Sequence, residues 1–315
     1  MKISIIGAGN VGGLTAMHLC SQGFGEVVLI DVIPKIASAK ALDLNDARFL
    51  LKSNCFMRGT GDINQIADSG IVVITAGFTR KPGMKREELV NKNSQIIREV
   101  SKNIKHLSPE SVVIVVTNPL DTMTYLTIKE TGFSPNRVLG MGLTLDCSRL
   151  ANLVAEASGV PVTEIEPCII GSHGEGMLPL ARYSKVKGRP LNKYFDSEKI
   201  SELFQKTQKR GAEIVTLLES GSAYFAPSAA ILELVRVIAQ DKKKILPVSV
   251  YLNGEYGLRN LCIGLPCRIG KNGIEKIVEL ELTDDEKPSF LRAADSIKQQ
   301  ILVLTNQEES QIYKA

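Results

Sequence analysis

The chain has 315 residues, of which 44% are hydrophobic and 23% are charged, and its formal net charge is +4. This is the composition of an ordinary globular protein that is long enough for two lobes with sizeable cores. The small basic excess is scattered, and the chain has no nucleic-acid-binding motif, so nucleic acid is not an expected partner.

The sequence does not indicate a membrane protein or a metal-binding protein either. No apolar run approaches the length of a membrane span, and a strand expected from residue 2 leaves no room for an ordinary signal peptide. The six cysteines include no Cys-x-x-Cys pair, which argues against a zinc site or a disulfide framework. They are Cys20, Cys55, Cys147, Cys168, Cys262 and Cys267. We therefore expect buried free thiols in a cytoplasmic protein without a metal.

Predicted strands and helices alternate through the first half of the chain. The strands are expected at 2–6, 26–30, 71–75, 111–116 and 137–139. The helical patterns lie at 11–22, 34–52, 88–106 and 119–130. Alternation of this kind predicts an α/β fold with a Rossmann-type, doubly wound parallel sheet.

The regular alternation of strands and helices ends at about residue 145. Helices are expected at 145–158, 198–219, 227–240 and from 284, and strands near 164–170, at 245–252 and at 260–269. Asn253-Gly254 and Asn272-Gly273 are typical of hairpin turns. The polar tail from Asn306 is expected to be loose. We predict two domains, 1–144 and an α+β catalytic domain over 145–315, with the active site in the cleft between them.

A glycine-rich turn follows the first predicted strand. Its sequence is Gly7-Ala8-Gly9-Asn10-Val11-Gly12, and an amphipathic run follows to Gln22. Gly7 permits the tight turn, Gly9 lets a pyrophosphate approach the backbone, and Gly12 lets helix and strand pack closely. The helix start then offers unpaired N–H groups to the phosphates. The first domain is therefore expected to bind a dinucleotide.

Asp31 ends the second predicted strand, at the position that distinguishes NAD from NADP. A carboxylate there accepts hydrogen bonds from the adenosine ribose hydroxyls and repels the extra phosphate of NADP. Lys35 is the nearest cation. NAD is therefore the expected cofactor; elsewhere in a chain, such an acid would more often be a solvated strand end.

Three residues form a candidate catalytic set. His173 follows a predicted strand and is flanked by glycines, which makes it the best general acid/base among the three histidines. Asp146 and Arg149 are three residues apart on one helix face. Asp146 could orient the imidazole and Arg149 could bind a carboxylate. The alternative is a plain ion pair on a helix surface.

The segment 77–91 is long, polar and basic, and carries Arg80 and Arg86. Segments like this often act as lids over a substrate, and the alternative is a flexible surface loop. Asn118 precedes Pro119 at a strand end, where it could contact nicotinamide or substrate, or simply begin a turn.

Several motifs, taken in order, resemble the lactate/malate dehydrogenase family. They are Gly7–Gly12, Thr75–Arg86, Thr117-Asn118-Pro119, Leu145–Arg149, Gly171–Gly174, Gly221–Pro227 and Tyr251–Gly257. The resemblance covers essentially the whole chain. It implies an enzyme that transfers a hydride between a 2-hydroxy acid and nicotinamide.

The resemblance implies a role for each catalytic residue. His173 exchanges the hydroxyl proton, Asp146 orients His173, and Arg149 binds the carboxylate beside the reacting carbon. Arg86 polarises the carbonyl oxygen, and Asn118 helps to seat substrate and nicotinamide. The implied cofactor contacts are Gly7, Ala8, Gly9, Asn10, Val11, Gly12, Asp31, Asn93, Val116, Thr117 and Asn118.

Arg80 favours the malate branch of the family, whose members resemble one another in having Arg at this loop position where lactate enzymes typically have Gln. The second carboxylate of malate or oxaloacetate needs a cation beside it, whereas with lactate Arg80 would be enclosed unpaired. An uncompensated buried charge costs roughly 3–5 kcal/mol. We expect reversible NAD-dependent oxidation of (S)-malate to oxaloacetate, a reaction of the tricarboxylic acid cycle. Leu143-Thr144 and Glu175 depart from the family pattern and could alter rate or packing near the cofactor.

Three alternatives are weaker. A lactate or other 2-hydroxy-acid dehydrogenase conflicts with Arg80. An NAD-dependent glycoside hydrolase would need a longer chain and a Cys/His metal site. An NAD-sensing module would not need the catalytic set. A homo-oligomer is expected, a tetramer rather than a dimer, with the helix at 34–52 as a plausible subunit contact.

Overall fold

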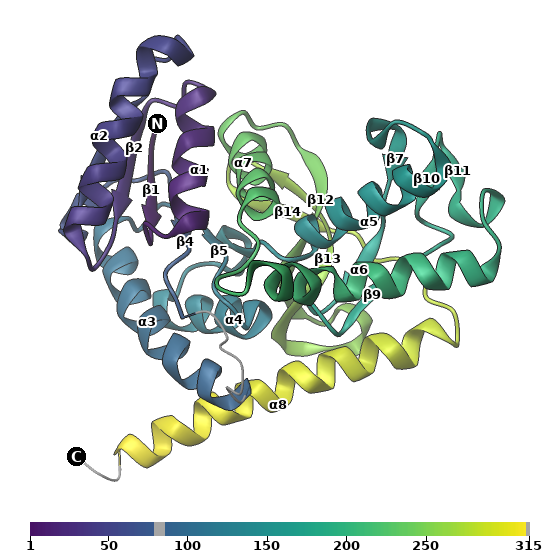
Figure 1. Ribbon diagram of the computed structural model, residues 1–315. Helices are drawn as coiled ribbons and strands as arrows, with labels where there is room; N and C mark the ends of the chain where they lie inside the picture. Colours follow the sequence, from purple (N-terminus) through teal and green to yellow (C-terminus); the bar gives the residue numbers. More distant parts are fainter. Residues whose placement is uncertain (79–85, 313–315) are drawn as a thin grey trace.

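The computed structural model describes the backbone of residues 1–78 and 86–312, and the side chains of 1–78 and 87–304 (Figure 1). The six strands of the first half are β1 (Lys2–Ile6), β2 (Glu26–Ile30), β3 (Phe56–Thr60), β4 (Ile71–Ile74), β5 (Val112–Val115) and β6 (Val138–Gly140). They are all parallel and lie in the order β3-β2-β1-β4-β5-β6. This order is the doubly wound arrangement that the alternation predicts.

Helices cover both faces of this sheet. The first four are α1 (Asn10–Ser21), α2 (Pro34–Leu51), α3 (Arg86–Leu107) and α4 (Leu120–Thr131). On β1, Ile3 and Ile5 pack into the core shared with α1, whereas Ile6 packs into the core shared with α3. Strands covered on both faces are nearly continuous apolar runs, which is why the sequence reveals them so readily.

Strand β3 is not apparent from the sequence. This strand lies at the edge of the sheet and buries Met57 alone, while Phe56 and Arg58 are exposed. An edge strand with one buried residue and a glycine at position 59 carries neither the apolar run nor the clear alternation that marks a strand.

The second half extends the same sheet with antiparallel strands. They are β12 (Lys244–Asn253), β13 (Arg259–Gly270), β14 (Gly273–Ile277), β8 (Ile169–Gly171) and β9 (Met177–Pro179). Ser249 on β12 pairs with Gly140 on β6, so the two halves share one sheet. The remaining elements are α5 (Leu143–Ser158), α6 (Ser197–Leu218), α7 (Phe225–Ala239), α8 (Glu286–Ile312) and the small sheet of β7 (Ile165–Glu166), β10 (Lys185–Val186) and β11 (Arg189–Pro190).

One expectation about the second half is wrong. The single strand near 164–170 is two strands, β7 and β8, which belong to different sheets. Pro167 separates them, because proline has no N–H to donate to a ladder. Helix α8 runs along the lower edge of the molecule in Figure 1, and its backbone continues past Asn306 to Ile312.

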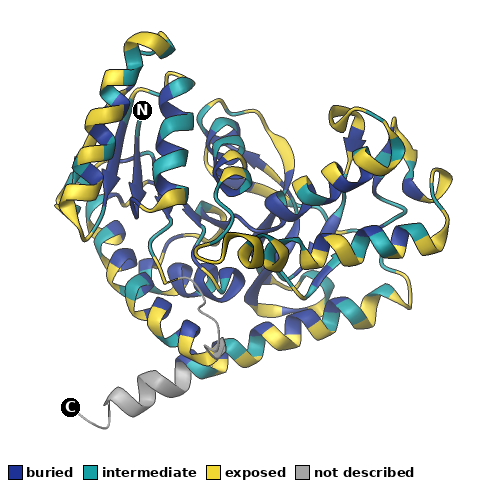
Figure 2. Cartoon of the chain, viewed as in Figure 1, coloured by how far each residue is buried: buried dark blue, intermediate teal, exposed yellow. Residues whose placement is uncertain are grey.

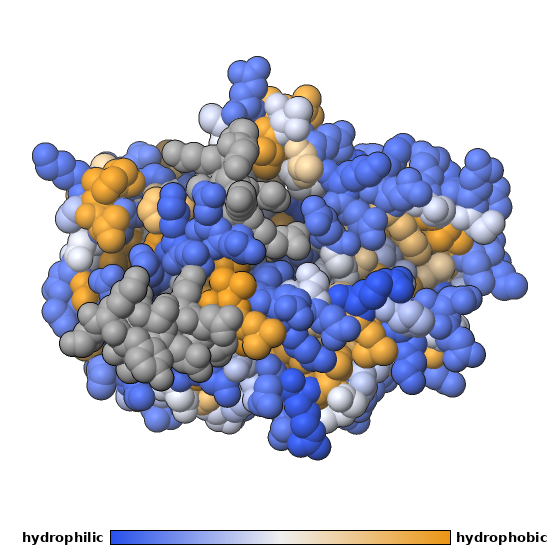
Figure 3. Space-filling model, turned by 90° about the horizontal axis from the view of Figure 1, so that it is seen from below, coloured by the Kyte–Doolittle hydropathy of each residue, from blue (hydrophilic) through white to orange (hydrophobic). Residues whose placement is uncertain are grey.

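Buried residues concentrate in the sheet and on the helix faces that cover it (Figure 2). Hydrophilic residues dominate the face seen in Figure 3, with smaller groups of apolar residues among them. The six cysteines are free thiols, five of them buried, as predicted. No helix in the described part of the chain is long and apolar enough to span a membrane.

Candidate active site

The glycine-rich turn between β1 and α1 has the shape that a dinucleotide needs. Gly7 has a φ of +110°, and a Cβ at Gly12 would lie 1.9 Å from the Gly7 carbonyl oxygen, so neither position accepts a side chain. A Cβ at Gly9 would meet no atom within 4 Å. Neighbouring atoms therefore fill the space next to Gly7 and Gly12, whereas the space next to Gly9 is free. A pyrophosphate would approach the start of α1 there.

Asp31 stands directly beside this turn. Its carboxylate accepts hydrogen bonds from the backbone N–H of Ala8 at 2.7 Å and from that of Ile33 at 2.9 Å. The side chain is thus fixed at the end of β2, where the adenosine ribose of NAD would lie. The open turn, its unpaired first-turn amides and this carboxylate together fit NAD.

His173 and Asp146 form a short hydrogen bond at the other end of the cleft. His173 follows β8 and Asp146 lies in the first turn of α5, and His173 Nδ1 is 2.7 Å from Asp146 Oδ2. Asp146 is completely buried, whereas the His173 side chain is 18% exposed. Since a carboxylate only accepts, Nδ1 carries the proton and Nε2 is left free for a substrate.

The environment of His173 favours its protonated form. Burial by itself lowers the pKa of His173, but the adjacent Asp146 carboxylate and its hydrogen bond outweigh that effect, so the net pKa is raised. A histidine whose protonated form is stabilised by a carboxylate is suited to act as a general acid/base.

Arg149 completes the catalytic set. Its Nη1 donates to Asp146 Oδ1 at 3.1 Å, and its side chain is 12% exposed. The Nε of Arg149 is buried and has no hydrogen-bond partner among the described residues. A buried donor without a partner is costly, and a substrate carboxylate would supply the missing acceptor. The surface ion pair considered as an alternative does not fit this burial.

A cavity of about 850 Å³ joins these groups to the nucleotide half of the molecule. Its walls bring together six residues that the sequence analysis selects: Val11, Val116, Thr117, Asn118, Arg149 and His173. The cavity continues from the start of α1 past the ends of β4 and β5 to α5. Its position outside the carboxyl ends of parallel strands is typical of ligand sites in doubly wound folds.

Asn93 lies behind the cavity wall rather than in it. The side chain is completely buried, donates to the Asn118 carbonyl at 2.6 Å and to the Phe78 carbonyl at 3.1 Å, and accepts from the Phe78 N–H at 2.8 Å. The nitrogen and the oxygen of the Asn93 side-chain amide are thus both hydrogen-bonded within the protein. In this structure Asn93 fixes the backbone of Asn118, which itself faces the cavity.

Two predicted site residues cannot be placed. Arg80 lies outside the described residues, and Arg86 is the first residue of α3 but its side chain is not among those described. Leu143, a departure from the family pattern, is buried and packs towards β13, where a Cβ at Gly264 would lie 2.2 Å from it. Its extra volume is thus accommodated by a glycine in the core.

Asp121, which is not among the residues predicted from the sequence, supports the backbone of His173. Asp121 Oδ2 accepts from the backbone N–H of His173 at 3.0 Å, and Oδ1 accepts from the Ser249 hydroxyl at 2.6 Å. Burial raises the pKa of Asp121 to about 6, although both hydrogen bonds oppose the rise. Asp121 lies three residues after Asn118 on α4, but nothing in the sequence indicates that it reaches His173.

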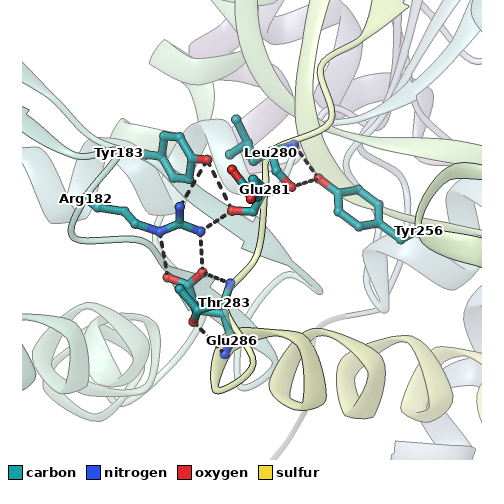
Figure 4. Close-up of polar contacts among 7 residues, drawn as sticks. All are labelled: Arg182, Tyr183, Tyr256, Leu280, Glu281, Thr283 and Glu286. Carbon is teal, nitrogen blue, oxygen red and sulfur yellow. Dashed lines mark hydrogen bonds and ion pairs between the residues drawn. The ribbon is translucent and has the colours of Figure 1, made fainter.

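A polar cluster fixes the start of α8, whose Ser289, Ser296 and Gln300 line the outer wall of the cavity. Arg182 binds the Glu286 carboxylate at 2.7 Å and the Glu281 carbonyl (Figure 4). Glu286 and Thr283 also exchange hydrogen bonds in a capping box. The start of this helix is therefore held rigidly against the β9–β10 connection.

No group of His, Cys, Asp and Glu side chains in the described ranges could hold a metal ion.

Comparisons with known proteins agree with this geometry. The family profile described as the lactate/malate dehydrogenase NAD binding domain matches residues 1–140, and that described as the alpha/beta C-terminal domain matches residues 143–308. A malate dehydrogenase from Geobacillus thermodenitrificans (strain NG80-2) is 44% identical over 306 residues, which cover 96% of this chain and 98% of the relative.

Solved protein structures also resemble this chain over nearly its whole length. A malate dehydrogenase from Salinibacter ruber has a TM-score of 0.94 at 37% identity, covering 98% of this chain and 99% of that one. A lactate dehydrogenase from Cryptosporidium parvum, solved with lactic acid and the dinucleotide cofactor, has a TM-score of 0.93 at 34% identity, with coverage of 97% and 98%. These matches confirm the predicted fold class, the NAD cofactor and the oxidoreductase class. The chain belongs to the lactate/malate dehydrogenase family.

Proposed function

We propose that the chain is a malate dehydrogenase that interconverts (S)-malate and oxaloacetate with NAD. The observation that carries the proposal is the buried set of His173, Asp146 and Arg149 at one cavity beside an open dinucleotide turn. Curated relatives that share 42–44% of their residues with this chain are malate dehydrogenases, which supports the malate branch.

We assign a role to each residue; the surroundings of His173, Asp146 and Arg149 support theirs, and the role of Arg86 comes from the family resemblance. NAD, when bound, would supply the acceptor for the hydride of the hydroxyl-bearing carbon. His173 Nε2 takes the hydroxyl proton during oxidation and returns it during reduction, and Asp146 stabilises the imidazolium between these steps. Arg149 holds the carboxylate beside the reacting carbon through its free Nε. Arg86 stabilises the negative charge that develops on the carbonyl oxygen.

The cofactor half has its own set of proposed contacts. The backbone of Gly7–Gly12 receives the pyrophosphate, and Asp31 receives the adenosine ribose. Val116, Thr117 and Asn118 seat the nicotinamide, with Asn93 acting through Asn118. We also propose that the two domains divide between residues 144 and 145, close to where the two family profiles meet.

We propose that the chain forms a homo-oligomer, a tetramer rather than a dimer. Helix α2 supports subunit contact, because it exposes several large apolar side chains that water solvates poorly: Ile36, Leu42, Phe49 and Leu50. We place the enzyme in the cytoplasm and in the tricarboxylic acid cycle, as expected from its free thiols and its reaction.

The substrate test compares oxaloacetate with pyruvate at equal concentration, with NADH absorbance as the readout. The second carboxylate of oxaloacetate needs the Arg80 cation, so we expect the unmodified enzyme to favour oxaloacetate by at least about a hundredfold. Arg80→Gln should lower oxaloacetate turnover and improve pyruvate relative to it. Arg259→Gln, at an exposed arginine at the start of β13, is the matched control and should leave the ratio unchanged.

Lactate remains the second candidate substrate, because lactate dehydrogenases are also among the similar solved structures. Faster turnover of pyruvate than of oxaloacetate by the unmodified enzyme would favour it and would contradict the malate proposal. If Arg80→Gln lowered the turnover of oxaloacetate and of pyruvate equally, the proposed role of Arg80 in substrate choice would be contradicted, but the malate dehydrogenase proposal would not.

A further inference from the structure

Lys40 reaches from α2 to the glycine-rich turn of the cofactor site. Its Nζ donates to the Ala8 carbonyl at 2.7 Å and to the Gly9 carbonyl at 3.0 Å. On the other side of the same residue, Asp31 accepts the Ala8 N–H at 2.7 Å. Both backbone polar groups of Ala8 are thus fixed by charged side chains from separate elements.

These contacts help to determine where the next two amides point. In a trans peptide unit the C=O and N–H bonds point in opposite directions, so the hydrogen bond from Lys40 to the Ala8 carbonyl directs the N–H of Gly9 away from Lys40. The Gly9 carbonyl accepts from Lys40 and also from the Gly13 N–H at 2.9 Å, so Lys40 and the first turn of α1 together direct the N–H of Asn10. Among the described residues, neither N–H donates a hydrogen bond, and the space over Gly9 is open. Two aligned donors therefore face the place where the pyrophosphate would lie.

The charge of Lys40 also points to an anion. Lys40 is half-buried, and no carboxylate of the described chain lies within ion-pair distance of it. It stands beside the start of α1, where the helix dipole already places partial positive charge. An anionic group bound at the turn would therefore be attracted both by Lys40 and by the start of α1.

Gly13 provides the space for this side chain. A Cβ at Gly13 would lie 2.9 Å from Lys40 Nζ and 3.1 Å from Lys40 Cδ. Gly13 is one residue past the Gly-x-Gly-x-x-Gly motif, whose spacing does not require it. The passage of Lys40 across the first turn of α1 gives this additional glycine a physical reason.

We propose that Lys40 is a positioning residue for the pyrophosphate of NAD: it aligns the Gly9 and Asn10 amides and supplies a counter-charge to the phosphates. The inference goes beyond the proposed function, because it concerns the half of the cofactor that is remote from the reacting carbon. It holds for either substrate of the family.

The first test is direct binding without substrate. The chain has no tryptophan, so the emission of NADH itself reports binding. Lys40→Met should raise the Kd for NADH, and the Kd for ADP-ribose measured by competition, by about tenfold, since it removes charged hydrogen bonds and a charge. The Kd for adenosine, which has no phosphate, should not change.

Two further measurements distinguish a loss of pyrophosphate positioning from damage to the fold. They are the salt dependence of the Kd for NADH and the affinity of a conservative variant. In Lys40→Met the Kd for NADH should depend less on salt than in the unmodified protein, because one screened charge is gone. Lys40→Arg should restore most of the affinity. Lys52→Met, at the far end of α2, is the matched control and should behave like the unmodified protein.

Gly13→Ala supplies an independent test that leaves Lys40 in place. The added methyl meets only the flexible end of Lys40 and raises helix propensity, so the fold should be retained while Lys40 is displaced. It should weaken ADP-ribose binding, and the double variant should be no weaker than Lys40→Met. Unchanged ADP-ribose binding in Lys40→Met, or an equal loss for adenosine, would overturn the proposal.

Discussion

His173→Asn should abolish turnover while NADH still binds. Asn cannot exchange a proton near neutral pH, and positioned acid/base catalysis contributes about 10²- to 10⁴-fold. We therefore expect kcat for oxaloacetate reduction to fall by about 10²- to 10⁴-fold. The Kd for NADH should be unchanged, because His173 lies at the substrate end of the cavity and not at the nucleotide turn.

His106→Asn is the matched control for this prediction. His106 is exposed near the end of α3, and the same substitution there should leave both kcat and NADH binding as they are. Retained turnover in His173→Asn would contradict the acid/base role. Loss of NADH binding together with turnover would show that the substitution disturbs the site as a whole.

Asp146→Asn should lower kcat roughly 10²- to 10⁴-fold, by analogy with loss of the orienting carboxylate in hydrolase triads. The Asn amide would donate to Nδ1 of His173, which moves the ring proton to Nε2 and makes the ring unable to accept the hydroxyl proton of malate. The Arg149 guanidinium would also lose its buried counter-charge. Steady-state kinetics in both directions measures this loss.

The pH profile of Asp146→Asn has a predictable sign. In the unmodified enzyme Asp146 holds the pKa of His173 above its ordinary value against the opposing effect of burial. Oxaloacetate reduction needs protonated His173, so its rate falls as the pH rises through that pKa. Without the carboxylate the pKa of His173 should fall, because burial still opposes protonation and the largest opposing cause is gone, so the residual rate should fall at a lower pH.

The control is Glu156→Gln, which makes the same charge change at an exposed position on α5. It should leave kcat and the pH profile unchanged. A profile of Asp146→Asn that stays in place, or that moves to higher pH, would contradict the coupling between Asp146 and His173.

The cofactor site could be predicted from the sequence because it is almost entirely local. The strand, the turn Gly7–Gly12 and the helix start are contiguous, and the φ of Gly7 and the close approach at Gly12 are requirements of single backbone positions. The Asp146 and Arg149 pair was also readable, since residues three apart share a helix face.

The support around these groups could not be predicted, because it joins residues that are distant in the chain. Asp121 lies 52 residues from His173 and 128 from Ser249, yet it hydrogen bonds to both. Lys40 reaches a turn 32 residues away. A polar side chain in a helix carries no mark of its long-range partner, which depends on how the elements pack.

The sequence by itself determined the doubly wound alternation apart from β3, the dinucleotide turn and the family, and it indicated the residues that we propose to carry the chemistry. Periodicity, glycine geometry and short spacings are properties of the local chain, so they are visible without a fold. Only the tertiary structure decided that β6 and β12 join the two halves in one sheet, that Pro167 splits a predicted strand between two sheets, and that Asp121 and Lys40 support the site. These features depend on packing across the sheet, where neighbours in space are not neighbours in sequence.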